Sequence, residues 1–239
     1  MYANFFDEKL FYAINHATTH SYSFDLFVSS LSSAHFIGGG WLTLFFWWFW
    51  FSGKEESSRN HNRSLVICTV FSSYASLVIA RVVSLFAPWR GRPLNDPPAD
   101  FIPSQVLDPH AFVEWSSFPS DHAVLFFAIA TGLFFLSRPL GLLIFAYVTI
   151  FICLPRIYLG IHYPTDIIAG ALIGIGTTWA IVSVEKIRNG LTAFTEAWEF
   201  KHPSSFYTSF YLLTFLLAVK FNEVKGIGKS IFLFLKGSS

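Results

Sequence analysis

The stretch FPSDH, at residues 118–122, and the stretch RIYLGIHYPTD, at residues 156–166, decide how this chain folds. Each stretch places ionisable side chains beside a long apolar segment, where a charge is costly and usually marks a functional site. Proline and glycine punctuate both stretches, as they do where helices begin and end. The sequence therefore predicts one polar site that forms at the ends of apolar helices.

The composition is that of an integral membrane protein. Of the 239 residues, 53% are hydrophobic, 19% are aromatic and only 13% are charged, whereas about 25% of the residues of soluble domains are charged. The net charge of +1 gives no indication of a nucleic-acid partner. Cys68 and Cys153 lie inside apolar runs, so we expect two buried thiols and no disulfide.

The apolar periodicity predicts a single all-α membrane domain over residues 1–239. We expect a bundle of about six transmembrane helices, although two of them are short of the roughly 20 residues that a crossing needs. The predicted spans cover residues 34–51, 65–88, 122–136, 140–154, 167–184 and 205–221. Residues 1–23 contain an amphipathic helix predicted to lie along the membrane surface, with Asp7 on its polar side. Residues 222–239 form a basic tail.

The connections between the predicted spans indicate the orientation. We expect a polar loop at residues 52–64, a basic loop after residue 184 and an ordered, proline-rich loop outside the membrane at residues 89–119. Positive charges follow the first, third and fifth spans, which places these connections in the cytoplasm. The residues concerned are Lys54, Arg59, Arg63, Arg138, Lys186, Arg188 and Lys201. The polar site then faces away from the cytoplasm, and the side of the lysine-rich tail stays open.

The polar residues at this outer end predict a phosphate site. Arginine matches phosphate oxygens bidentately, and a helix start offers free N–H groups and a positive dipole end to an anion. Arg92, Arg156 and Ser120 are therefore the candidate phosphate ligands. Two of them also have a purely structural explanation when taken singly. Ser120 could serve as a helix cap and nothing more, and Arg156 could simply extend its side chain toward the membrane surface.

Two histidines could supply the reaction. Phosphoryl transfer needs an in-line nucleophile and a proton for the leaving oxygen, and histidine can serve in either role near neutral pH. We assign His162 as the nucleophile, with Asp166 four residues later to fix its ring orientation. His122 is left as the acid, and neither a metal nor another cofactor is required. Asp121 either contacts the site or caps the helix that begins there.

These residues resemble the type 2 phosphatidic acid phosphatase superfamily, the membrane lipid phosphate phosphatases. The third motif of that family is Ser-Arg, five residues, His, three residues, Asp. It is matched by Arg156, His162 and Asp166, with Pro155 in place of the serine. The resemblance covers residues 65–181, which we take as the motif-bearing core.

The other two motifs of the family are matched less completely. The second, Pro-Ser-Gly-His, is matched at residues 119–122 with Asp121 in place of glycine, a variant familiar among bacterial members that act on isoprenoid diphosphates. The first, Lys, six residues, Arg-Pro, is matched only at Arg92 and the proline after it. Leu85 occupies the place of the lysine, so Arg81 and Arg90 become candidates to supply the missing charge to the phosphate.

The resemblance implies a bundle of six transmembrane helices and metal-independent hydrolysis through a phosphohistidine. The favoured substrate is undecaprenyl diphosphate or another isoprenoid diphosphate, at the outer side of a bacterial inner membrane. Hydrolysis of phosphatidic acid or phosphatidylglycerophosphate, lipid phosphotransfer, and non-catalytic binding or transport of a lipid phosphate remain alternatives. The expected partners are the lipid substrate and membrane lipids, and the oligomeric state stays open.

Overall fold

The computed structural model describes residues 4–17, 20–33, 39–98, 100–113 and 115–219. Within these residues the regular secondary structure is helical, with no strand. The elements are α1 (Phe5–Asn15), α2 (Tyr22–Ser33), the short 3₁₀ helix η1 (Gly40–Thr43), α3 (Leu44–Phe51), α4 (Glu56–Phe86), α5 (Asp121–Leu136), α6 (Arg138–Tyr147), the π-helical turn η2 (Val148–Cys153), α7 (Leu154–Tyr158), α8 (Pro164–Ser183), α9 (Glu185–Lys201) and α10 (Pro203–Ala218).

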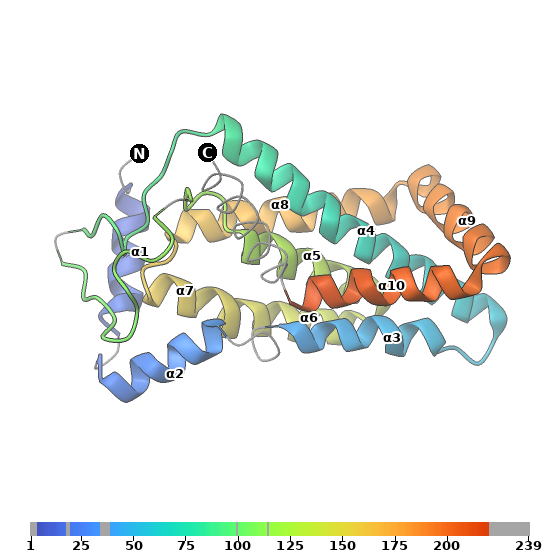
Figure 1. The fold of residues 1–239 in the computed structure, drawn as a ribbon, viewed down its shortest axis with the longest axis horizontal. Helices are drawn as coiled ribbons and strands as arrows, with labels where there is room; N and C mark the ends of the chain where they lie inside the picture. Colours follow the sequence, from blue (N-terminus) through green and yellow to red (C-terminus); the bar gives the residue numbers. More distant parts are fainter. Residues whose placement is uncertain (1–3, 18–19, 34–38, 99, 114, 220–239) are drawn as a thin grey trace, which may run out of the picture.

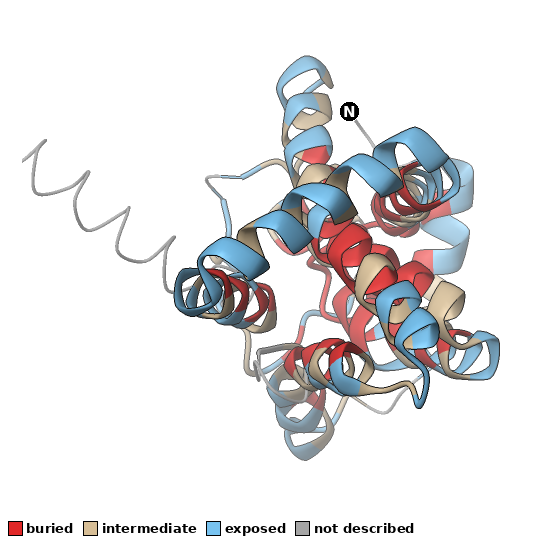
Figure 2. Ribbon diagram, turned by 90° about the vertical axis from the view of Figure 1, so that its right-hand side faces the viewer, coloured by how far each residue is buried: buried red, intermediate tan, exposed pale blue. Residues whose placement is uncertain are grey.

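The long helices run side by side along the longest axis of the molecule (Figure 1). At one end lie α1, α2 and the loop between α4 and α5, and α9 crosses the other end. Helix α5 is the centre of the bundle, because it contacts α4, α6 and α8 and is buried over most of its length. Figure 2 shows these buried turns enclosed by helices whose outer faces are exposed.

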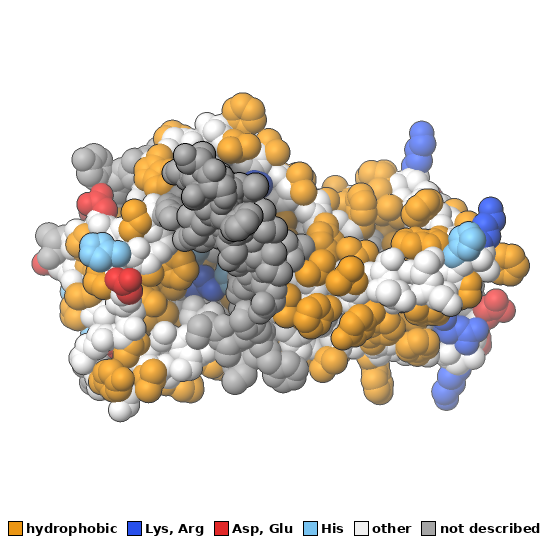
Figure 3. Space-filling model, viewed as in Figure 1, with side chains coloured by type: hydrophobic (Ala, Val, Ile, Leu, Met, Phe, Trp, Pro, Cys, Tyr) orange, Lys and Arg blue, Asp and Glu red, His pale blue; other side chains and the backbone are white. Residues whose placement is uncertain are grey.

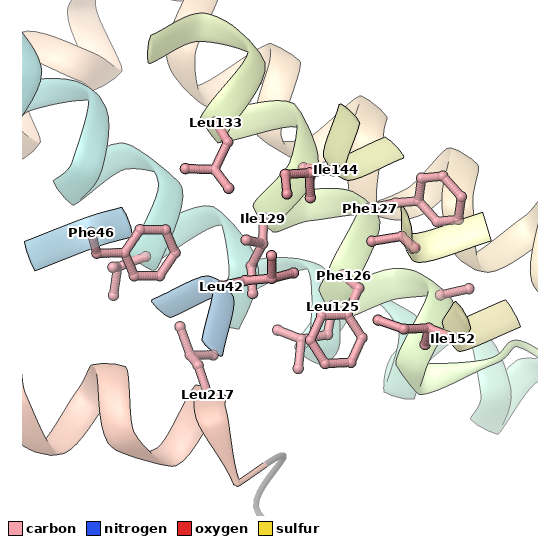
Figure 4. Packing of buried hydrophobic residues seen from close by; sticks show 14 of the residues in the cluster. Leu42, Phe46, Leu125, Phe126, Phe127, Ile129, Leu133, Ile144, Ile152 and Leu217 are labelled. Carbon is pink, nitrogen blue, oxygen red and sulfur yellow. The ribbon is translucent and has the colours of Figure 1, made fainter. Parts of the chain in front are cut away.

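The core is built on the apolar face of α5. Phe126, Ile129 and Leu133 are fully buried there, and they belong to one cluster with Leu42 from η1 and Ile144 from α6 (Figure 4). Side chains from η1 and α6 therefore meet those of α5. The position of α5 is fixed by packing on several sides.

Two glycines bring α8 against α5. A Cβ atom at Gly170 would lie 2.7 Å from the carbonyl oxygen of Ser120, and one at Gly174 would lie 2.3 Å from that of Val124. Small residues four apart allow two membrane helices to approach this closely. As a result, the first turns of α5 and α8 lie together, and the Ser120 N–H donates to the Asp166 carbonyl oxygen at 3.1 Å.

Among the residues that the structure describes, three helical stretches are long and apolar enough to cross a membrane. They are Glu56–Phe86, Arg138–Tyr158 and Pro164–Ser183, and Figure 3 shows hydrophobic side chains over the middle of the molecule. The protein is therefore a membrane protein. Helices α5 and α10 have 16 residues each, which is about 24 Å of helix. The expected bundle of six spans stays a prediction, and the expected start of the first span at residue 34 lies outside the described residues.

Two of the predicted loops are wrong. Helix α4 begins at Glu56, inside the expected loop at residues 52–64, and the basic segment after residue 184 forms α9. Both segments are polar because their helices extend out of the apolar layer or cross its end, where side chains meet solvent. Polar composition locates the membrane boundary, and it does not by itself end a helix.

The helix predicted to stop at residue 154 continues to Tyr158. Pro155 follows residue 154, and a proline within a helix lacks an N–H and clashes with the carbonyl group four residues earlier. In the structure the wider π-helical turn η2 comes directly before α7, and such turns adjust the hydrogen-bond ladder within a continuing helix. Arg156 consequently lies on the helix and not in the following loop.

Helix α1 forms as predicted, but its predicted polar face is wrong. Asp7, Phe11 and Asn15 are buried, whereas Phe5 and Phe6 are exposed. Helix α1 packs against α7 and α8, so the face that carries Asp7 turns toward the protein. The predicted basic tail at residues 222–239 lies outside the described residues.

Candidate active site

Backbone hydrogen bonds bring three distant segments together at the α1 end of the bundle. The N–H of Ser117 donates to the carbonyl oxygen of Arg90 at 2.9 Å, and the N–H of Leu94 donates to that of Gly160 at 2.9 Å. Gly160 has φ +70°, and a Cβ there would lie 2.7 Å from Phe101, which explains the glycine at this turn. The long loop after α4 is thereby fixed against the loop that precedes α8.

His162 is held in this junction with one ring nitrogen engaged. Its side chain is buried, and Nδ1 lies 2.9 Å from the carbonyl oxygen of Ser117 and 3.6 Å from Oδ2 of Asp166. A carbonyl oxygen only accepts, so Nδ1 carries the hydrogen and Nε2 keeps its lone pair. The sequence analysis missed Ser117, because a backbone acceptor leaves no signal in the residue type.

The surroundings of His162 keep its ring neutral. Burial and the nearby charges of Arg92 and Arg156 lower its pKa from 6.5 to about 4, although the hydrogen bond and charge of Asp166 act in the opposite direction. At neutral pH the imidazole is therefore uncharged. A neutral ring with a free Nε2 is the form that can attack phosphorus.

Arg92 and Arg156 are buried cations with unsatisfied donors. Their exposed fractions are 8% and 7%. Nη1 of Arg92 donates to the carbonyl oxygen of Ile161 at 2.7 Å and lies 3.5 Å from Nε2 of His162. Nη2 of Arg156 lies 3.5 Å from the carbonyl oxygen of Ser32. In the described part of the chain, the Nε atoms of both arginines have no hydrogen-bond partner. Buried donors of this kind are costly, and an anion would satisfy them.

Ser120 and His122 lie at the start of α5. Ser120 is fully buried and caps the helix, with its hydroxyl oxygen 3.5 Å from the N–H of Ala123. His122 is in the first turn, and its ring lies 6.3 Å from that of Phe126. The predicted capping role of Ser120 is present, and it is compatible with an anion at the same helix end because the first N–H groups of a helix have no partner within it.

Arg90 is engaged in two buried ion pairs. Its Nη1 lies 2.7 Å from Oδ1 of Asp166, and its Nη2 lies 2.5 Å from Oδ2 of Asp7. Its guanidinium also stacks over the ring of Tyr163 at 4.3 Å. Both terminal nitrogens are thus occupied by carboxylates. This geometry makes Arg90 a support for Asp166, and its predicted contact with phosphate stays a prediction.

Asp166 is fully buried at the start of α8 and accepts from two directions. Besides the ion pair with Arg90, its Oδ2 accepts from the N–H of Tyr163 at 2.8 Å. The carboxylate therefore closes the first turn of α8 and reaches the ring of His162 at the same time. Sequence reasoning placed Asp166 beside His162, and the structure brings the two together.

Arg81 lies at the edge of the site. Its Nη2 is 2.5 Å from Oδ2 of Asp121, and the two side chains are 43% and 30% exposed. Leu85, at the position of the missing lysine, points away with 77% of its surface exposed. Arg81 thus neutralises Asp121 through Nη2, and its predicted contact with phosphate stays a prediction.

An open pocket of about 540 Å³ adjoins Arg92. Trp89, Trp115 and Tyr163 give it aromatic walls, and Glu8 and Asp96 line it as well. Within the described residues, no group of three or more His, Cys, Asp or Glu side chains could hold a metal ion. Cys68 and Cys153 are buried, free thiols, as predicted.

Comparison with known proteins finds two partial matches to this chain. No solved structure matches the chain. The bacitracin transport permease protein BcrC of Bacillus licheniformis is 42% identical to it over 60 residues, which are 25% of this chain and 29% of the relative. The chain thus matches less than a third of that relative's length. A second comparison matches residues 92–189 to the PAP2 superfamily, a range that includes Arg92, Ser120, His122, Arg156, His162 and Asp166. Residues 92–189 of this chain are therefore similar to the PAP2 superfamily.

Proposed function

We propose that this protein hydrolyses a membrane lipid phosphate or diphosphate without a metal ion, through a phosphohistidine at His162. The observation that carries the proposal is the position of Nε2 of His162 beside Arg92, with Arg156 nearby and an unpaired Nε on each of these two arginines, as on Arg90. These donors suit a phosphoryl group in front of the imidazole. The match to the PAP2 superfamily supports a phosphoric ester hydrolase in general.

The reaction proceeds in two displacements. Nε2 of His162 forms a bond to phosphorus as the bond from phosphorus to the leaving oxygen breaks, and His122, protonated at the start, donates its proton to that oxygen. Water then attacks the phosphohistidine and gives a proton to His122, and the phosphorus–nitrogen bond breaks to release inorganic phosphate. Arg92, Arg156 and the first turn of α5 at Ser120 stabilise the charge on the equatorial oxygens throughout.

The second ring nitrogen of His162 supports both steps. When Nε2 becomes bonded to phosphorus, the ring acquires positive charge, and its Nδ1–H stays directed at the carbonyl oxygen of Ser117. The carboxylate of Asp166, 3.6 Å from Nδ1, stabilises that charge. Asp166 and Ser117 thus keep Nε2 as the reacting atom.

The proposed substrate is undecaprenyl diphosphate or a related isoprenoid diphosphate. The Pro-Ser-Asp-His form of the second motif supports this choice, since it resembles bacterial members that act on such lipids. A relative named for bacitracin transport is compatible with a role in the bacterial cell envelope. The exposed aromatic side chains of Trp89 and Trp115 beside Arg92 could contact the lipid as it enters.

The proposed location is the outer side of a bacterial inner membrane. Basic side chains gather at the α9 end of the molecule, opposite the end formed by α1 and the long loop (Figure 3). The connection between α3 and α4, and α9 itself, carry Lys54, Lys186, Arg188 and Lys201. This charge distribution favours a cytoplasmic α9 end and an outward-facing site.

Phosphate release by detergent-purified protein tests the proposal. The protein, in EDTA, is offered undecaprenyl diphosphate, farnesyl diphosphate or phosphatidic acid, with His162→Ala as the control. We expect release from the diphosphates that is lost in His162→Ala and inhibited by vanadate, which can adopt the five-coordinate shape of the transferring phosphoryl group. Release only from phosphatidic acid or phosphatidylglycerophosphate would identify the protein as a glycerolipid phosphatase.

Two further outcomes would contradict hydrolysis. Transfer of labelled phosphate to a lipid or sugar acceptor, with little free phosphate, would identify a phosphotransferase. A protein that binds the lipid equally well with His162→Ala, but loses binding when Arg92 or Arg156 is replaced, and never releases phosphate, would be a lipid-phosphate binder or transporter. Activity that vanishes with EDTA would contradict the metal-free mechanism.

A further inference from the structure

We propose that Asp7, on the N-terminal helix α1, is a positioning residue of the phosphate site, which acts on Asp166 through Arg90. The inference rests on the proposed function and extends it to a part of the chain outside the PAP2 match at residues 92–189. It gives helix α1 a part in catalysis, although the amphipathic pattern of this helix suggests only a membrane-surface element.

Asp7 is buried, and both of its carboxylate oxygens accept hydrogen bonds. It has no exposed surface, although it lies in the first turns of an N-terminal helix. Its Oδ1 accepts from the N–H of Thr165 at 2.9 Å, and its Oδ2 accepts from the hydroxyl of Thr165 at 2.7 Å. The backbone N–H of Thr165 belongs to the first turn of α8, where an N–H lacks a partner within the helix. Asp7 therefore caps α8 from another helix.

Arg90 connects Asp7 to the reacting histidine. Its two terminal nitrogens contact one carboxylate each, Asp7 at 2.5 Å and Asp166 at 2.7 Å, and Nη1 also donates to the hydroxyl of Thr165 at 2.7 Å. Asp166 in turn lies 3.6 Å from Nδ1 of His162. A continuous chain of buried charged groups thus leads from α1 to the imidazole ring.

The charges in this chain explain why a second carboxylate is present. With Arg90 and Asp166 alone, the positive and negative charges would cancel, and little net charge would remain to stabilise the cationic ring of the phosphohistidine. With Asp7 the three groups carry a net charge of −1. Because all three are buried, water screens this charge only weakly. Asp7 therefore leaves Asp166 free to act on His162 while Arg90 holds Asp166 in place.

The single variant Asp7→Asn measures this effect, with Lys9→Gln as the matched control. Lys9 is also a charged residue of α1, it is exposed, and it does not line the pocket beside Arg92. We expect Asp7→Asn to lower kcat for diphosphate hydrolysis by about tenfold to a hundredfold, the range for outer groups that orient a functional histidine. KM should stay within about threefold because Arg92 and Arg156 still bind the phosphate. Lys9→Gln should behave as the wild type.

The double variant separates positioning by charge from a merely structural role. Arg90→Gln alone leaves two buried carboxylates without their cation. Asp7→Asn combined with Arg90→Gln returns the net charge of the three positions to −1, the wild-type value, and Asp166 carries that charge. We expect kcat of the double variant to exceed that of each single variant. Losses that multiply in the double variant would show that the groups only hold the fold, and would overturn the proposal. If Asp7→Asn does not fold, the comparison of the double variant with Arg90→Gln carries the same test.

The same experiment distinguishes failure of this inference from failure of the proposed function. If the wild type and Lys9→Gln release no phosphate, the proposed hydrolysis is wrong. If both release phosphate and Asp7→Asn does so with an unchanged kcat, the hydrolysis stands and the role of Asp7 is overturned. Thermal unfolding of each purified variant shows whether a loss of kcat reflects the site or the fold.

Discussion

Nη2 of Arg81 lies 2.5 Å from Oδ2 of Asp121, so an ion pair joins α4 to α5 at the edge of the site. The pair links two departures from the family pattern. Asp121 stands where the second motif has glycine, and Arg81 lies one helical turn before Leu85, where the first motif has lysine. Because both side chains are partly exposed, the pair contributes only about 0–1 kcal/mol to stability. The charge of Asp121 also reaches Arg92, so its neutralisation by Arg81 matters more for anion binding than for folding.

Arg81→Gln should therefore weaken substrate binding. Without Arg81, the carboxylate of Asp121 repels the phosphate, and about 1 kcal/mol of repulsion between partly exposed charges corresponds to a rise in KM of about fivefold. We expect kcat to change less, because His162 and its partners are untouched. Steady-state kinetics with farnesyl diphosphate at low ionic strength measures both constants.

The double variant with Asp121→Gly provides the control. It removes the unpaired carboxylate and restores the glycine of the motif, so KM should return toward the wild-type value. A KM that stays high in the double variant would show that Arg81 contacts the phosphate directly. Added salt should reduce the effect of Arg81→Gln, since partly exposed charges are screened.

The low pKa of His162 predicts the acid limb of the pH profile. The reacting form is the neutral ring, and its fraction falls only as the pH drops through about 4. We expect kcat/KM not to fall from pH 7 to about pH 5, whereas a nucleophile with the pKa of an ordinary histidine would begin to lose activity near pH 6.5. Hydrolysis of a soluble short-chain diphosphate at constant ionic strength measures the profile.

The variant Asp166→Asn tests the direction in which Asp166 shifts the pKa of His162. The carboxylate raises the pKa of His162 against the effects of burial and of the arginines, so its removal should move the acid limb to lower pH while kcat falls. Substrate binding should survive, because the phosphate ligands remain. A limb that moves to higher pH would show that another group limits the reaction.

The role of His122 predicts a dependence on the leaving group. A lipid phosphate leaves from a diphosphate more readily than an alkoxide leaves from a monoester, so it needs less help from an acid. We expect His122→Gln to lower hydrolysis of phosphatidic acid by about 10²-fold to 10⁴-fold, the usual contribution of a general acid, and hydrolysis of farnesyl diphosphate by less. Phosphate release from both substrates, compared for wild type and variant, measures the difference. Equal losses would assign His122 to phosphate binding.

The sequence predicted the apolar helices and the meeting of the two polar stretches, because both follow from local pattern. Long apolar runs and motif spacing place His162, Asp166 and Arg156 without knowledge of the tertiary fold. The extent of α4 and α9 was not predictable in this way, since a polar helix turn and a loop have similar compositions. The continuation of the helix past Pro155 depends on a π-helical turn that has no simple sequence signal.

The parts of the site that the sequence did not reveal depend on tertiary contacts. The Ser117 carbonyl that orients His162 is a backbone atom, and any residue could supply it. Asp7 and Arg90 meet across 83 residues of sequence, and Asp7 fell on the polar side of a helix that was expected to face water. A signal was nevertheless present in Arg90, because a buried arginine is costly unless a carboxylate pairs with it.

Close packing of α5 against α8 should set the geometry of the site, and Gly174→Ala tests this. The new Cβ would lie 2.3 Å from the carbonyl oxygen of Val124, so the helices must separate. We expect a loss of about 1–3 kcal/mol in stability and a lower kcat, measured by thermal unfolding and phosphate release. Gly176→Ala is the matched control, because nothing lies within 4 Å of its added Cβ and alanine favours the helix. Equal behaviour of the two variants would mean that α8 does not rely on this contact to hold His162 and Asp166 against α5.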